Sequence, residues 1–246
     1  MKISKPFLIM QLRPEDDTSD SEFRAILKYG GLEDNDACRL RIENTGIPEL
    51  ELDDYSAVIV GGSPFDISTP PDKKSAIQNK IEADFEMLLG KVVSRDFPFL
   101  GACSGNGLLG SFLNTSISTR YAEAVGCTRI SLTTEGKTDA LLTGFPDQIA
   151  VLLGHKEACD STPAGATLLM TGENCPVQMF RVGENVYATQ FHPEGDCEGF
   201  TVRIHAYKHH GYFRPEQAEQ LIEAVGQETT PYAQKILRRF VARYAR

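Results

Sequence analysis

The stretch Pro98-Phe99-Leu100-Gly101-Ala102-Cys103-Ser104-Gly105-Asn106-Gly107-Leu108-Leu109 passes from an apolar run, through small residues, into a helical pattern of leucines. A strand that turns sharply into a helix exposes the residue at the turn, here Cys103, as a nucleophile elbow does with serine. The N–H groups that begin the helix favour a thiolate and can bind a developing oxyanion. The competing interpretation is that Cys103 is only a small buried apolar residue.

Short apolar runs alternate with amphipathic segments in the first half of the chain. Strands are predicted at residues 7–10, 38–42, 57–60 and 99–102. Helices are predicted from about residue 19 to residue 29 and along the apolar stripe from Ile77 to Leu88. This order predicts an α/β fold with a mostly parallel, doubly wound, flavodoxin-like sheet and helices on both faces. In such sheets, sites form at the carboxyl ends of the strands.

The second half of the chain is richer in paired strands and ends in helices. Strands are predicted at residues 126–133, 148–153, 167–171, 177–181 and 186–191. Gly183-Glu184-Asn185 is predicted to be a hairpin turn. Pro215 begins one predicted helix, and an apolar stripe from Tyr232 to Tyr244 marks the last. We expect a single domain over residues 1–246, with a helical extension over about 198–246.

Charge and cysteine content disfavour several classes of protein. The 34 acidic and 25 basic residues give a net charge of −9, which disfavours nucleic acid and anionic membranes as partners. No apolar run approaches the roughly 20 residues that cross a bilayer. No signal peptide is apparent, so a cytoplasmic location is expected. The six cysteines include no C-x-x-C pair, and we expect neither a zinc site of that kind nor a disulfide scaffold.

Two further segments place functional groups at the ends of predicted strands. The strand that begins at Val186 delivers His192, with Glu194 two residues on. His192 can take the thiol proton and later protonate a leaving amine, and Glu194 can fix its tautomer. The strand that begins at Val58 ends in Gly61-Gly62, whose N–H groups can complete an oxyanion hole. Taken alone, a His-Pro-Glu is most often an exposed loop, and a Gly-Gly pair is most often only a turn.

Together, the three segments resemble the class I glutamine amidotransferase family in order, spacing and length. The family pattern is a Gly-Gly turn, then a Gly-x-Cys-x-Gly elbow, then His-Pro-Glu. Here these are Gly61-Gly62, Gly101-Ala102-Cys103-Ser104-Gly105 and His192-Pro193-Glu194. The resemblance is to a glutaminase-type domain, similar to that of GMP synthase, and covers most of residues 6–195.

The resemblance implies a role for each matching residue. Cys103 would be the nucleophile, His192 the general base and acid, and Glu194 the carboxylate that orients His192. The amides of Gly62 and Ser104 would be the oxyanion donors. No cofactor is implied.

The presumed substrate pocket departs from the family pattern. The family usually has Gln at the fourth residue after the nucleophile, where Gly107 stands, so one amide is missing from the pocket. The glycine pair is followed by Ser63-Pro64, where the family more often has Pro at once. His155, in a segment that resembles the family's substrate-side loop, either lines the pocket or is a surface histidine.

The resemblance implies hydrolysis of a γ-glutamyl amide through a thioester, which converts glutamine to glutamate and ammonia. The residues after Glu194 are predicted to be helices only, so a separate synthase subunit is expected to receive the ammonia, and a homo-oligomer is left open. One alternative is a free-standing γ-glutamyl peptidase or hydrolase, which Gly107 and the missing synthase favour. Another is a catalytically silent regulatory or binding homologue.

Other candidate sites have weaker support. His205 and His209 form an i,i+4 pair on a predicted helix, followed by His210, but no Cys, Asp or Glu accompanies them at ligand spacing. We therefore expect no metal site there. No P-loop and no Gly-x-Gly-x-x-Gly after a strand is present, so neither ATP nor NAD is expected.

Overall fold

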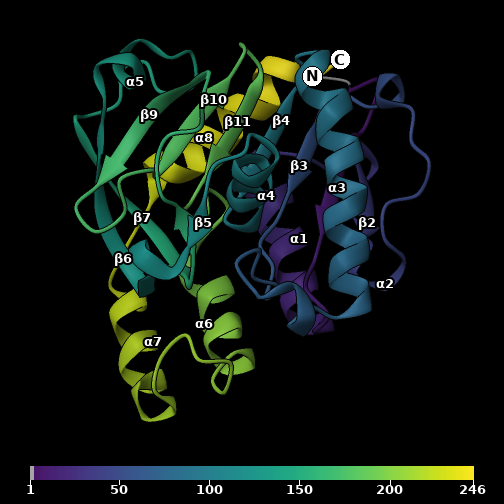
Figure 1. The fold of residues 1–246 in the computed structure, drawn as a ribbon. Coiled ribbons are helices and arrows are strands. Elements are labelled where there is room, and N and C mark those ends of the chain that lie inside the picture. The colour runs from purple at the N-terminus through teal and green to yellow at the C-terminus, as the bar shows by residue number, and fades with distance from the viewer. Residues whose placement is uncertain (1–2) are drawn as a thin grey trace.

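The computed structural model describes residues 3–246 and has one large sheet. The strands of this sheet are β1 Phe7–Gln11, β2 Ala37–Arg41, β3 Val58–Val60, β4 Phe99–Ala102, β6 Glu123–Leu132, β7 Gln148–His155, β9 Ala166–Gly172, β10 Met179–Val182 and β11 Val186–Thr189. Their order across the sheet is β2-β1-β3-β4-β11-β10-β9-β6-β7 (Figure 1). A small antiparallel sheet pairs β5 (Ile117–Ser118) with β8 (Ala158–Cys159).

The strand order confirms the predicted fold class. Strands β2, β1, β3, β4 and β11 run parallel, in the flavodoxin-like order 2-1-3-4-5 with β11 as the fifth strand. The remaining neighbours pair antiparallel, and β10 and β11 form the hairpin predicted around Gly183. The parallel pairing of β11 with β4, which sets Thr189 opposite Ala102, brings the carboxyl ends of these two strands together.

The helices begin and end at recognisable signals. Their bounds are α1 Asp16–Gly30, α2 Ile42–Thr45, α3 Ala76–Ser94, α4 Ser104–Phe112, α5 Thr134–Thr138, α6 Cys197–Ala206, α7 Ala218–Gly226 and α8 Pro231–Tyr244. The hydroxyl of Ser75 caps α3 by accepting the Gln78 N–H at 3.2 Å. Gly31 ends α1 in the left-handed conformation, with φ of 71°. Helix α1 begins at Asp16, earlier than predicted.

Helices cover both faces of the sheet. Successive side chains of β1 alternate between the faces. Phe7 and Ile9 share one buried core with α1 and α8, and Leu8 and Met10 share the other with α3 and α4. This packing holds the carboxyl ends of β1, β3, β4 and β11 at one edge of the sheet (Figure 1). At the opposite edge, the backbone N–H of Lys5 donates to the carbonyl of Arg246 at 3.1 Å.

The C-terminal helices occupy two different places. Helix α8 packs on α1 and β7, and its Ile236 and Phe240 are buried in the core that contains Phe7. It is therefore part of the helical layer that covers this face of the sheet. Helices α6 and α7 project beyond β6 and β7 (Figure 1) and share a small apolar cluster with Leu152 of β7 and Val125 of β6. Within residues 3–246, no helix has both the length and the apolar character to cross a membrane.

We expect Phe240→Ala to lower the free energy of unfolding by about 3–5 kcal/mol, the usual loss for a buried phenylalanine. Phe240 is fully buried, and its ring meets the Tyr187 ring edge-on with centroids 6.4 Å apart. Urea denaturation measures the loss. Tyr232→Ala, at a 37% exposed position of the same helix, is the control and should cost much less. Equal losses for the two variants would contradict the placement of α8 in the core.

Candidate active site

Cys103 occupies a sharp turn between β4 and α4. Its backbone has φ of 54° and ψ of −94°, a conformation that residues other than glycine rarely adopt. A Cβ atom at Gly101 would lie 2.9 Å from backbone atoms of Gly105, so the turn leaves no room for a side chain there. Backbone strain of this kind is concentrated at functional sites. The strand-to-helix elbow predicted for this segment is therefore present.

His192 lies just beyond β11, next to the end of β4. Its Nδ1 is 2.7 Å from Oε1 of Glu194, and its ring meets the Phe200 ring edge-on at 5.6 Å. The Nη2 atom of Arg203, on α6, donates to the same Glu194 oxygen at 2.8 Å. The His192, Glu194 and Arg203 side chains are buried. The carboxylate thus orients the imidazole, Arg203 orients the carboxylate, and Nε2 is left available to accept a proton.

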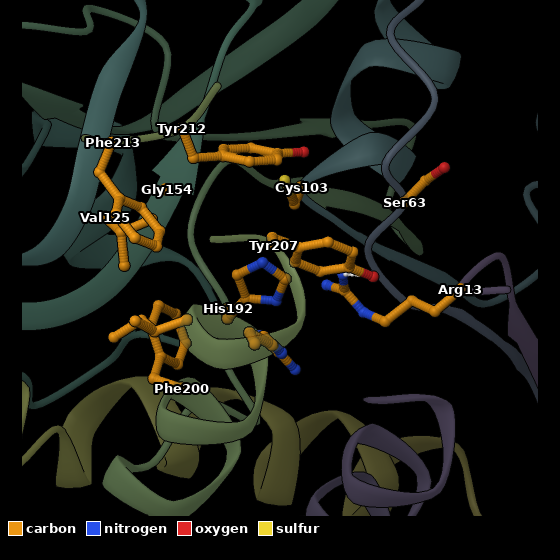
Figure 2. Close-up of a pocket in the computed structure, with 12 residues that line it drawn as sticks. Arg13, Ser63, Cys103, Val125, Gly154, His192, Phe200, Tyr207, Tyr212 and Phe213 are labelled. Atoms are coloured by element: carbon orange, nitrogen blue, oxygen red, sulfur yellow. Dashed lines mark hydrogen bonds between the residues drawn. The ribbon is translucent and has the colours of Figure 1, made fainter. Parts of the chain in front are cut away.

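Cys103 and His192 line one cavity of about 30 Å³ (Figure 2). A space of this size holds about one or two water molecules. Tyr207 and Tyr212 extend over it, and Arg13 reaches it from beyond the end of β1 (Figure 2). The fold therefore brings two of the predicted catalytic residues to one cavity, with Glu194 directly behind the imidazole.

The glycine turn after β3 is positioned differently from the expectation. The N–H of Gly62 donates to Oε1 of Glu22 at 3.0 Å, so it is already occupied. A Cβ atom at Gly62 would lie 2.8 Å from Cε1 of His192, which shows that this glycine packs against the imidazole. The next residue, Ser63, lines the cavities on both sides of Cys103. The Gly62 N–H is thus engaged by Glu22, and Ser63 is a further candidate for the oxyanion donor that was expected at Gly62.

The neighbouring predicted residues hold the elbow in place. The N–H of Gly61 donates to the carbonyl of Met10 at 3.0 Å, and the carbonyl of Gly61 accepts the Ser104 hydroxyl at 3.0 Å. These bonds join the carboxyl end of β3 to the start of α4. The backbone N–H groups of Ser104 and Ser63 have no hydrogen-bond partner within residues 3–246. Both are therefore available to a ligand.

A buried network of charges surrounds the turn. Nε of Arg13 lies 2.8 Å from Oε1 of Glu22, and Nη2 of Arg203 lies 3.5 Å from the same oxygen. Arg203 also joins Glu194, so two arginines and two carboxylates share one network. Sequence reasoning missed Arg13, Glu22 and Arg203 because they are far apart in the chain. The one available signal was the position of Arg13, three residues after the end of a predicted strand, at the edge where sites form.

Burial sets the protonation of the site. It raises the pKa of the Cys103 thiol to about 12, against the opposing effect of Arg13 and Arg203. It also lowers the pKa of His192 below 6.5, against the effect of Glu194. Burial alone would raise the pKa of Glu194, but His192 and Arg203 hold it well below its usual range. Burial thus favours the neutral forms of both the Cys103 thiol and the His192 imidazole, while the two arginines oppose this effect at the thiol.

A second cavity of about 20 Å³ lies on the other side of Cys103, next to Gly107 and Glu157. The Glu157 carboxylate accepts the N–H groups of Ile67 and Ser68, each at 2.7 Å. A Cβ atom at Gly107 would lie 3.6 Å from Oε1 of Glu157. Glu157 therefore occupies the space beside Gly107 into which a longer side chain would extend. It is a candidate binding residue that the sequence reasoning did not single out.

His155 also borders this second cavity, but its ring nitrogens are both engaged. Nδ1 lies 3.0 Å from the carbonyl oxygen of Glu157, and Nε2 lies 3.0 Å from Oε2 of Glu123. His155 is thus a buried residue whose hydrogen bonds support the loop that carries Glu157, not a surface histidine.

Two groups of side chains have the spacing of metal ligands. They are Glu123, His155 and Cys175, and Glu22, His192 and Glu194. In each group a hydrogen bond already joins the histidine to a carboxylate. His205 lies on α6, which ends at Ala206, so His209 and His210 lie beyond it and the predicted helical pair does not form.

Comparisons with known proteins agree with this architecture. The sequence model of the family "Glutamine amidotransferase class-I" matches residues 20–206. The chain belongs to this family. One subunit of the glutamine-hydrolyzing GMP synthase of Sulfolobus acidocaldarius is 26% identical over 145 residues, which cover 58% of this chain and 70% of that protein. The GMP synthase of Caldicellulosiruptor saccharolyticus is 33% identical over 105 residues, 42% of this chain and only 20% of that protein.

Solved structures extend the likeness of fold to nearly the whole chain. A glutamine amidotransferase from Thermotoga maritima superposes with a TM-score of 0.77 at 21% identity, over 98% of both chains. One from Methylobacillus flagellatus gives 0.69 at 17% identity, over 98% of this chain and 96% of that one. The match to the amidotransferase family model ends at residue 206, just before Tyr207, Tyr212 and Phe213, which line the first cavity.

We expect Glu194→Gln to move the pH dependence of Cys103 alkylation by a glutamine-like chloroketone. The reaction needs a neutral His192 as proton acceptor, so its rate falls as the pH drops through the His192 pKa. Glu194 raises that pKa, so its loss should shift the fall to lower pH. The plateau rate should fall about 10²–10⁴-fold, because the imidazole loses its orientation and the support for its charge.

Rates measured by mass spectrometry between pH 5 and 9, with circular dichroism to verify folding, test this expectation. Glu184→Gln, at a hairpin position where the side chain is 77% exposed, is the control. An unshifted profile in Glu194→Gln would show that His192 is not the proton acceptor.

Proposed function

We propose that this chain hydrolyses γ-glutamyl amides, converting glutamine to glutamate and ammonia through a thioester on Cys103. One observation carries the proposal: the strained elbow at Cys103 opens onto the same cavity as His192, whose Nδ1 is held by Glu194 at 2.7 Å. A thiol beside a cavity, a buried base and a carboxylate that orients the base are the groups that nucleophilic acyl transfer requires.

The geometry supports a sequence of proton transfers through His192. The Cys103 sulfur attacks the amide carbon while Nε2 of His192 takes the thiol proton. The resulting oxyanion is bound by the free N–H groups of Ser104 and Ser63, and the start of α4 adds a favourable dipole. His192 then gives its proton to the leaving nitrogen, the C–N bond breaks and ammonia departs. Water attacks the thioester with His192 as base, which releases glutamate and restores the thiol.

The second cavity suits the acyl part of the substrate. Glu157 presents a carboxylate there beside Gly107, where an α-ammonium group would be bound. Burial raises the pKa of Glu157, and the N–H groups of Ser68 and Ile67 oppose this by stabilising the ionised form. Glu157 would thus supply polar recognition in the space left by the missing glutamine side chain at position 107.

A separate synthase chain as ammonia acceptor is part of the same proposal. The relative from Sulfolobus acidocaldarius is named as one subunit of its enzyme, which supports an acceptor on another polypeptide. A free-standing γ-glutamyl hydrolase is the second candidate, favoured by Gly107 and by the walled cavity next to His192. A catalytically silent homologue is disfavoured because the Cys103, His192 and Glu194 side chains are all in place.

We expect a glutamine-like chloroketone or diazo ketone to add to Cys103 alone, as shown by intact mass and peptide mapping. Cys103→Ala should abolish labelling and lower glutamine turnover by at least about 10³-fold, because no nucleophile remains. His192→Ala should have a similar effect on turnover.

Cys38→Ala, at a half-buried thiol on the edge strand β2, is the matched control and should retain both labelling and turnover. Labelling at another residue, or near-parental activity of Cys103→Ala, would remove the basis of the proposal.

A further inference from the structure

We propose that the cavity on the His192 side of Cys103 binds the amine portion of the substrate, and that the preferred substrates are γ-glutamyl conjugates of an apolar amino acid. This inference rests on the hydrolysis at Cys103 proposed above. It adds a leaving-group subsite made of an apolar wall and a guanidinium.

The two cavities divide the substrate at the amide bond. Cys103 and Tyr212 border both cavities, but His192 borders only one, and Glu157 borders only the other. His192 must reach the departing nitrogen to protonate it, so the leaving group lies on its side. When glutamine is the substrate this leaving group is ammonia, which needs no walled subsite.

The walls of this cavity are largely apolar and aromatic. Phe200 and Ile204 come from α6, Phe213 from the segment after it, and Val125 from β6, and Figure 2 shows Phe200, Phe213 and Val125 gathered on one side of His192. Phe200 and Ile204 are buried. An isobutyl or benzyl side chain placed here would be removed from water, a gain of about 1.5–3 kcal/mol for a side chain of that size.

Arg13 supplies a polar group at the opposite wall. Its side chain is buried, with Nε donating to Glu22 at 2.8 Å and Nη1 to the Tyr207 hydroxyl at 3.1 Å. Nη2 has no hydrogen-bond partner within residues 3–246, and Figure 2 shows the guanidinium reaching toward the space near His192. A free guanidinium N–H at the wall of a cavity suits a carboxylate, and an amino-acid leaving group carries one beside its nitrogen.

The charges around the cavity favour a ligand that carries a single carboxylate. Arg13 and Arg203 face Glu22 and Glu194 in the buried network, so the network is neutral when all four groups are ionised. Such a site can bind one carboxylate through a directed hydrogen bond, but it lacks the excess positive charge that a phosphate ester would need. The subsite therefore fits an amino acid better than a nucleotide.

The cover of the cavity has to move for such a substrate to enter. The cavity measures about 30 Å³, far smaller than an amino acid, and Tyr207, Tyr212 and Phe213 are among the residues that line it. Tyr207 also bonds Oε2 of Glu15 at 3.0 Å, and the ring of Tyr212 lies 4.7 Å from Nζ of Lys156. Outward movement of residues 207–213 would open the apolar wall and release a second N–H of Arg13 from Tyr207.

The test compares kcat/KM for glutamine, γ-glutamylglycine, γ-glutamylphenylalanine and γ-glutamylphenylalanine amide. We expect γ-glutamylphenylalanine to exceed both glutamine and γ-glutamylglycine by at least about tenfold, because its side chain fills the apolar wall. Amidation of its carboxyl group should lower kcat/KM by at least about tenfold, because the partner of Arg13 is lost.

Variants assign the two preferences to their residues. Phe213→Ala should lower the preference for γ-glutamylphenylalanine over γ-glutamylglycine about tenfold. The double variant Arg13→Met, Glu22→Gln leaves no unpaired buried carboxylate at position 22 and should remove the discrimination between the acid and its amide. Tyr232→Ala, on α8, is the control and should change neither preference. If the double variant fails to fold, the comparison of acid with amide in the parent protein decides the question.

The outcomes separate this inference from the proposed function. Turnover of glutamine with no preference for γ-glutamylphenylalanine, or an amide as good as the acid, would overturn the subsite and leave the glutaminase reaction intact. Failure to hydrolyse any of the four substrates, together with no chloroketone labelling of Cys103, would overturn both.

Discussion

The parallel pairing of β11 with β4 is the constraint on which the site depends. Thr189 lies opposite Ala102, so each strand ends beside the other and the residues that follow, Cys103 and His192, reach one cavity. A shift of one residue in this register would reverse the faces of every side chain on β11. The elbow and the His-Pro-Glu turn are local structures, but only the sheet brings them together.

Buried charges also link the parts of this arrangement. Glu22, on α1, accepts the N–H of Gly62 and pairs with Arg13 and Arg203, while Arg203 also supports Glu194. Buried charges are tolerated only where they are paired and hydrogen-bonded, so loss of one member leaves the others uncompensated. The turn after β3, helix α1 and the Glu194 carboxylate are thus joined by one network of buried hydrogen bonds and ion pairs.

The sequence predicted those parts of the molecule whose signals are local. Buried strands, the elbow at Cys103 and the hairpin at Gly183 each follow from a short pattern, and the sheet order follows from their alternation with helices. The hydrogen bond from the Gly62 N–H to Glu22 could not be predicted in this way, because Glu22 lies on a separate helix. The raised pKa of the Cys103 thiol could not be predicted from the elbow alone, because Tyr207 and Tyr212, which line its cavity, follow α6. The apolar stripe of α8 predicted a helix, but a stripe does not specify which part of the core that helix packs against.

The meeting of Lys5 and Arg246 has a practical consequence. Because these residues meet at the amino-terminal edge of the parallel strands, away from the edge that carries Cys103, a fluorophore on an exposed side chain there, such as that of Arg246, is held clear of the nucleophile. Labelled protein can therefore be used in binding assays without obstruction of the cavity beside the thiol.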